Sequence, residues 1–100
     1  MARYRFTNKA VDDLTQIWNY TLIKWSENQA DIYYRMLIES CKEIAFNPDL
    51  GKGYSGIKEN LLGIKSGRHI IFYHKIDENE IEIIRILHER MDLKNRITEK

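Results

Sequence analysis

The sequence has 100 residues, with 16 Lys and Arg against 15 Asp and Glu, which gives a formal net charge of +1 and a pI near 7.8. A chain of this length forms one domain, here residues 1–100, and its core needs neither metal nor disulfide support. The near-neutral balance excludes a general attraction to nucleic acid, so we expect no direct sequence-specific nucleic-acid binding by the chain alone.

The cysteine and the N-terminal residues bear on the cellular compartment. Cys41 is the one cysteine, so no internal disulfide can form, and we expect a small buried apolar residue in a reducing compartment. The first ten residues lack the apolar run of a signal peptide, and no stretch approaches about 18 consecutive apolar residues. We therefore expect a cytoplasmic protein. The scattered histidines lack the spacing of metal ligands, so no metal or cofactor is expected.

The N-terminal half predicts a strand followed by a helical hairpin. Residues 3–6 alternate and favour a strand, whose partner the sequence does not reveal. Thr7 or Asn8 can then cap a first helix. Its apolar stripe predicts burial of one face: Val11, Leu14, Ile17, Trp18, Leu22 and Trp25. Ser26 and Gln29 fit a capping box, so a second helix begins almost where the first one ends.

The second helix is expected to stop at Asn47, because the residue before a proline is pushed out of the helical region. Its apolar stripe lies at helical spacing: Ala30, Tyr33, Tyr34, Leu37, Cys41, Ile44 and Ala45. Residues 49–60 contain three glycines among polar residues and predict a surface loop. The GxG within this loop follows no predicted strand and opens no helix, so it does not indicate a phosphate-binding loop.

Residues 60–90 organise the chain, because they contain three apolar runs separated by turn residues and predict an antiparallel meander. In the last run, Ile81, Ile83 and Leu87 alternate with Ile84 and Ile86, which indicates a strand covered on both faces, near the centre of the sheet. The polar cluster at its end, residues 88–90, is where we expect function to concentrate.

A short final helix from Leu93, capped by Asp92, completes the predicted order of strand, helix, helix and three strands. The predicted fold class is α+β, β-α-α-β-β-β, with a helical hairpin packed on a small, mainly antiparallel four-stranded sheet.

Several strings in this order resemble the ParE branch of the RelE/ParE toxin superfamily. They are DL at 13–14, IWNY at 17–20, NP at 47–48 followed by Gly51, GRHIIFY at 67–73 and IRILHERMD at 84–92. The resemblance implies a toxin of a type II toxin-antitoxin system that binds DNA gyrase and blocks it. It also implies neutralisation by a ParD-type antitoxin, whose disordered tail folds over the hairpin and the sheet.

Two sets of candidate contact residues follow. For gyrase, the polar end of the last strand and the tail offer Arg68, His88, Glu89, Arg90, Lys94 and Arg96. For the antitoxin, the apolar surface between hairpin and sheet offers Trp18, Trp25, Tyr33 and Arg85, on which an amphipathic segment can lie.

These residues also have structural interpretations. Trp18 and Trp25 fall on the helix stripe and are most simply core, whereas an exposed Trp would mark a groove for a partner. Arg85, flanked by isoleucines, needs a carboxylate, such as a Glu of the sheet, or a partner contact. His69, His74 and His88 are most simply hydrogen-bonded or solvated strand residues.

A ribosome-dependent mRNA endonuclease of the RelE branch is the alternative function. Cleavage at a 2′-hydroxyl needs a base, a cation for the phosphate and an acid. His88 and Glu89 could exchange protons, and Arg68, Arg85 and Arg90 could hold phosphate. The chain has no Tyr after Tyr73, and apolar Ile70 aligns with an arginine of the nucleases. A decayed, non-toxic binding module is a third possibility.

Overall fold

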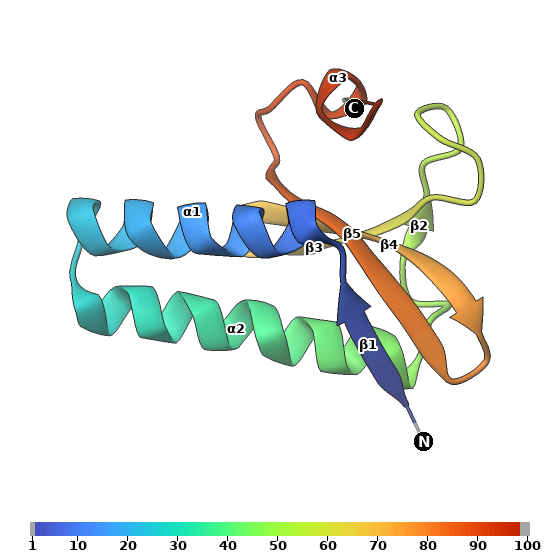
Figure 1. Cartoon of the computed structure of the whole chain (residues 1–100), viewed down its shortest axis with the longest axis horizontal. Helices are drawn as coiled ribbons and strands as arrows, with labels where there is room; N and C mark the ends of the chain where they lie inside the picture. The colour runs from blue at the N-terminus through green and yellow to red at the C-terminus, as the bar shows by residue number, and fades with distance from the viewer. Residues whose placement is uncertain (1, 99–100) are drawn as a thin grey trace.

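A computed structural model describes residues 2–98 and confirms the α+β class (Figure 1). The elements, in chain order, are β1 (Arg3–Phe6), α1 (Asn8–Lys24), α2 (Glu27–Phe46), β2 (Lys52–Gly53), β3 (Leu62–Ser66), β4 (His69–Asp77), β5 (Glu80–His88) and α3 (Leu93–Thr98). The predicted order of strand, hairpin, meander and short helix is therefore present, and β2 is an addition to it.

Both helices of the hairpin begin at side-chain caps that the sequence indicates. Thr7, in extended conformation, accepts a hydrogen bond from the Ala10 amide through Oγ1 at 3.1 Å. Ser26 does the same for the Gln29 amide at 3.1 Å, which confirms the second predicted cap. Each cap satisfies a backbone donor that has no partner within its helix, and the Ser26 cap lies in the short turn between α1 and α2.

The sheet has five strands in the order β1-β5-β4-β3-β2. β5 lies between β1 and β4, so the predicted inner position of the last strand is confirmed. β1, whose partner the sequence left open, pairs in parallel with β5, whereas the other pairs are antiparallel. The four predicted strands are all present, and residues 52–53 of the predicted loop add a two-residue fifth strand beside β3.

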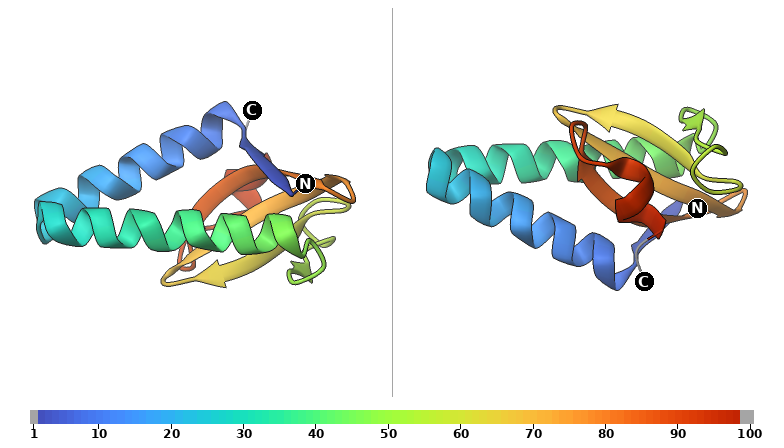
Figure 2. Two further views of the ribbon diagram at one scale, coloured as in Figure 1. Left: turned by 90° about the horizontal axis from the view of Figure 1, so that it is seen from below. Right: turned by 90° about the horizontal axis from the view of Figure 1, so that it is seen from above.

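The sheet is covered on both faces (Figures 1 and 2), and each face has its own cluster of buried apolar side chains. The hairpin covers one face, and the buried residues there include Leu37, Cys41, Ile44, Ile71, Tyr73, Ile81, Ile83 and Ile86. The short helix α3 and the 49–61 segment cover the other face, where Leu61, Ile70, Phe72, Leu87 and Ile97 are buried. Strand β5 contributes to both layers, as a strand covered on both faces must.

A bulge in β5 overturns part of the predicted alternation. Phe72 lies opposite Arg85 and Tyr73 lies opposite Ile83, so Ile84 has no partner across the β4–β5 pair. One extra residue reverses the side on which the following side chains point. Ile86, not Leu87, therefore joins Ile81 and Ile83 beneath the hairpin.

The hairpin extends past one end of the sheet. The turn between α1 and α2 extends past the strands in each view (Figures 1 and 2). Trp25 in this turn is 70% exposed, so the prediction that it is a core residue is wrong. Tyr34 on α2 is also exposed. Between residues 2 and 98, no helix is long and apolar enough to cross a membrane.

Candidate partner-binding groove

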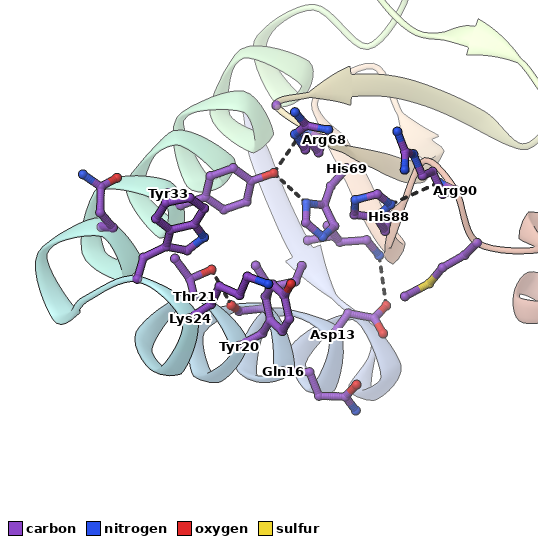
Figure 3. Close-up of a pocket in the computed structure, with 16 residues that line it drawn as sticks. Asp13, Gln16, Tyr20, Thr21, Lys24, Tyr33, Arg68, His69, His88 and Arg90 are labelled. Carbon is purple, nitrogen blue, oxygen red and sulfur yellow. Dashed lines mark hydrogen bonds between the residues drawn. The ribbon is translucent and has the colours of Figure 1, made fainter.

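A groove of about 1020 Å³ lies between the hairpin and one end of the sheet (Figure 3). We call it the hairpin groove. Its walls come from α1 and α2, the β3–β4 turn and the end of β5. The lining residues are Asp13, Gln16, Ile17, Tyr20, Thr21, Lys24, Trp25, Gln29, Tyr33, Gly67, Arg68, His69, Ile86, His88, Arg90 and Met91.

The apolar lining residues come from segments far apart in the sequence. Ile17, Tyr20 and Trp25 belong to α1 and the hairpin turn, whereas Ile86 and Met91 belong to β5 and the segment after it. Tyr20 is 63% exposed and Trp25 is 70% exposed. Large exposed apolar side chains beside a groove are typical of a surface that binds another molecule.

A hydrogen-bonded corner joins α2 to the turn between β3 and β4. The Tyr33 hydroxyl accepts from the Arg68 amide at 3.0 Å and lies 2.6 Å from His69 Nδ1. Burial lowers the pKa of His69 to about 4, so its ring is neutral at pH 7. A neutral His69 can accept at Nδ1, and we assign the Tyr33 proton to this bond. Burial also raises the pKa of Tyr33.

Gly67 makes this corner possible. Its φ is +60°, in the left-handed region that glycine adopts without strain. A Cβ at this position would lie 2.7 Å from the Tyr33 hydroxyl oxygen and 2.7 Å from Met36 Cε. The close approach of the turn to α2 therefore requires a residue without a side chain.

A buried ion pair fixes the opposite wall. Asp13 of α1 accepts from Arg85 Nε at 2.8 Å and from Arg85 Nη2 at 3.0 Å. Asp13 also accepts from the Ile86 amide at 3.0 Å. β1 pairs with β5 only as far as Phe6 and Ile83, so Asp13 protects the open edge of β5 beyond the end of β1.

Arg85 thus has a structural partner, but not the predicted one. The prediction named a Glu of the sheet, and the structure supplies Asp13 of α1 instead. Arg85 Nη1 also donates to the Arg96 carbonyl at 2.8 Å, which ties α3 to β5. Arg85 is 7% exposed, so its side chain offers little surface to an antitoxin.

The predicted gyrase-binding residues divide into two groups. Arg68, His88 and Arg90 line the hairpin groove, and the rings of His69 and His88 meet edge to face with centroids 5.3 Å apart. Glu89 does not line the groove. It pairs with Lys65 at 2.8 Å, and that hydrogen bond lowers the pKa of Glu89. Lys94 and Arg96 belong to α3, which packs on the face away from the hairpin.

The predicted antitoxin-binding residues also divide. Trp25 and Tyr33 line the groove. Trp18 does not, because it is half-buried between the helices and donates from Nε1 to Asp31 at 3.3 Å. Sequence reasoning missed Gln16, Tyr20, Lys24, Gln29, Gly67 and Met91 as lining residues. The sequence did contain a signal for some of them, because steps of four, three and four residues place a set of side chains on one face of the first helix. That set is Asp13, Ile17, Tyr20 and Lys24.

Among residues 2–98, no group of three or more His, Cys, Asp or Glu side chains is placed to hold a metal ion. The fold and the groove define a small α+β domain in which a helical hairpin and a mainly antiparallel sheet enclose an open cleft.

The comparisons with known proteins identify the family. The profile of the ParE toxin of type II toxin-antitoxin systems, parDE, matches residues 4–93. The chain belongs to the ParE toxin family. It is 33% identical over 92 residues to Toxin ParE1 of Mycobacterium tuberculosis H37Rv, covering 92% of this chain and 94% of the relative. Toxin ParE1 of Caulobacter vibrioides is 34% identical, with the same coverage.

A solved structure supports the fold. A chain of the chromosomal ParDE toxin-antitoxin system of P. aeruginosa superposes with a TM-score of 0.74 at 19% identity, over 88% of this chain and 96% of that one. The family and the fold that the sequence motifs predicted, those of the ParE toxins, are therefore confirmed.

Proposed function

We propose that this ParE-type toxin inhibits DNA gyrase by binding it, arrests growth in this way, and is neutralised by a ParD-type antitoxin. The observation that carries the proposal is membership of the ParE toxin family over residues 4–93. The ParDE system to which the structural relative belongs supports a ParD-type partner. The toxin acts through its surface and not through covalent chemistry.

The antitoxin is proposed to occupy the hairpin groove. Tyr20, Trp25 and Met91 line the groove and are exposed. An amphipathic segment that laid its apolar face there would remove these side chains from water, and each square ångström of apolar surface covered contributes about 25 cal/mol before the cost of ordering the segment.

The gyrase contact is proposed to involve Arg68, His88, Glu89 and Arg90 at the end of the sheet, with Lys94 and Arg96 of α3 as a second group. Arg68, His88 and Arg90 line the groove proposed for the antitoxin. An antitoxin seated there would cover them, so neutralisation would follow from occlusion of part of the gyrase-binding surface.

A supercoiling assay tests this function. We expect the purified chain to stop gyrase from supercoiling a relaxed plasmid and expect the ParD-type antitoxin to restore the reaction. Arg90→Glu should weaken inhibition while the domain stays folded, because Arg90 is exposed. Arg35→Glu is the matched control, since Arg35 is an exposed arginine of α2 outside the groove. Full supercoiling in the presence of excess wild-type chain would exclude the proposal.

One observation favours the endonuclease alternative. The fold brings Tyr33, His69 and His88 together, with Arg68 and Arg90 in the same groove. Such a set contains proton-transfer groups and cations for a phosphate. However, the Tyr33 hydroxyl is already engaged by the Arg68 amide and His69, and His69 has a pKa of about 4, which makes it a weak base.

Ribosomes translating a defined message separate the two functions. Under the gyrase proposal the message stays intact when the chain is added. Cleavage in the ribosomal A site, lost in a His88→Ala variant, would establish the nuclease. Activity in neither assay would favour a binding module without toxicity.

A further inference from the structure

We infer that the segment occupying the hairpin groove is an amphipathic protein segment with carboxylates on both of its edges. One edge faces Lys24 on the helical wall, and the other faces Arg68 and Arg90 on the sheet wall. This inference rests on the proposed function, because it specifies the chemistry of the antitoxin segment.

The balance of charge inside the groove supports an acidic occupant. Its charged lining residues are Asp13, Lys24, Arg68 and Arg90. Asp13 is already paired with Arg85 at 2.8 Å, so its charge is compensated within the fold. Within residues 2–98, Lys24, Arg68 and Arg90 form no salt bridge, although cations elsewhere on the sheet do. Three cations therefore remain for a partner, in a chain with a formal net charge of +1.

Two of these cations share one edge of the groove. The Glu89 amide donates to the Arg68 carbonyl at 3.0 Å, so the backbone beside Arg90 is hydrogen-bonded to that of Arg68. Figure 3 shows both guanidinium groups along the same wall. The nearby carboxylate of Glu89 makes its ion pair with Lys65, at 2.8 Å. A carboxylate brought by a partner could accept two parallel hydrogen bonds from one of these guanidinium groups, which is the geometry that they favour.

The third cation lies on the facing wall. Lys24 is the last residue of α1, beside Tyr20 and Thr21 (Figure 3). A lysine near the end of a helix already interacts favourably with the helix dipole, yet its exposed ammonium can still meet a carboxylate. The cations thus lie on two walls, with the apolar side chains of Ile17 and Ile86 among the residues that line the groove with them.

The exposed apolar side chains of the groove favour a protein segment over RNA. RNA presents a phosphate at each nucleotide, and binding without base contacts depends on a track of cations. The groove instead combines three cations with a neutral His69 and with exposed Tyr20, Trp25 and Met91. These apolar side chains match the apolar face of an amphipathic segment, and the cations match acidic residues at its edges.

The test is the affinity of the ParD-type antitoxin, measured by calorimetry against charge-reversed toxins. Arg68→Glu, Arg90→Glu and Lys24→Glu should each weaken binding by about tenfold, because reversal replaces an attraction with a repulsion. Arg35→Glu should change the affinity by less than about twofold, since exposed charges outside an interface contribute little. The wild-type affinity should also fall as salt is raised. Circular dichroism establishes that each variant is folded.

The outcomes separate this inference from the proposed function. If antitoxin binds tightly but the groove variants behave like Arg35→Glu, the acidic-segment inference is wrong and the proposed pairing stands. If the wild-type chain binds no antitoxin, the proposed function itself fails, and the inference fails with it. If a single-stranded uridine oligonucleotide binds more tightly than the antitoxin and loses affinity in the same variants, the groove is an RNA site and the inference is overturned.

Discussion

The Asp13–Arg85 ion pair is predicted to determine the stability of the domain and the position of α1. Asp13→Asn keeps the size of the side chain but removes its charge. In the wild-type chain, the Asp13 carboxylate accepts hydrogen bonds from three donors: Arg85 Nε, Arg85 Nη2 and the Ile86 amide. The amide side chain of the variant would offer one oxygen to them, so at least one donor loses its partner and the buried guanidinium loses the carboxylate charge of Asp13.

Loss of one partner from a buried pair destabilises by about 3–5 kcal/mol. We expect a loss of about 3 kcal/mol here, because a bond from Arg85 Nη1 to the Arg96 carbonyl remains. For a domain of this size, that corresponds to a fall of roughly 15 °C in the thermal midpoint. Urea unfolding followed by far-UV circular dichroism measures the change. Asp12→Asn, at an exposed position of the same helix, should stay within about 0.5 kcal/mol of the wild type.

A double-mutant cycle tests the cause of the loss. Arg85→Met combined with Asp13→Asn removes the buried guanidinium as well as the carboxylate, so the double variant should be less destabilised than the sum of the two single variants. Additive losses, or an Asp13→Asn variant as stable as Asp12→Asn, would refute the argument that this charge pair holds α1 to the edge of β5.

Three further predictions concern Gly67, His69 and Cys41. Gly67→Ala should destabilise the domain by about 1–2 kcal/mol because of its positive φ and the contact with Tyr33, whereas Gly53→Ala, with open space around its Cβ, should be almost neutral in the same urea assay. His69 has a folded pKa of about 4, below the ordinary 6.5, so the unfolded chain takes up a proton first. The contribution of neutral His69 to the free energy of unfolding is therefore complete above pH 6.5 and is lost as the pH falls towards 4. His69→Gln should reduce the dependence of the unfolding free energy on pH in this range, as measured by urea titrations at several pH values. Burial raises the pKa of Cys41 to about 12, so a thiol reagent at pH 8 should react at least about a hundredfold more slowly with the folded chain than with the urea-unfolded one.

The parts of the fold that the sequence predicted correctly depend on local patterns. Thr7 and Ser26 cap their helices through residues three positions ahead, and the strands of the meander follow each other across short turns. Local signals of this kind are complete within a few residues, so a single sequence contains them. The parallel β1–β5 pair joins residues about 77 positions apart, and nothing near Tyr4 identifies Ile81 as its partner.

The errors have long-range causes. The bulge at Ile84 depends on how β5 matches β4, and it moved Ile86 and Leu87 to the faces opposite those expected. The partner of Arg85 lies 72 residues away, so a sequence pattern could indicate the need for a carboxylate but could not select Asp13. The site residues Tyr33 and His69 are 36 residues apart, and only the fold brings them into one corner.

The exposure of Trp25 follows from where the hairpin lies on the sheet. The turn between α1 and α2 extends past the strands (Figures 1 and 2), so no strand covers Trp25 in that turn. The apolar side chain at the end of the helix stripe lines the hairpin groove instead. A partner that binds only the folded chain stabilises it by about 2.7 kcal/mol when present at a hundred times its dissociation constant. This is close to the loss expected for Asp13→Asn, so an antitoxin seated in the groove should largely restore the stability of that variant, provided that α1 still forms the wall to which the antitoxin binds.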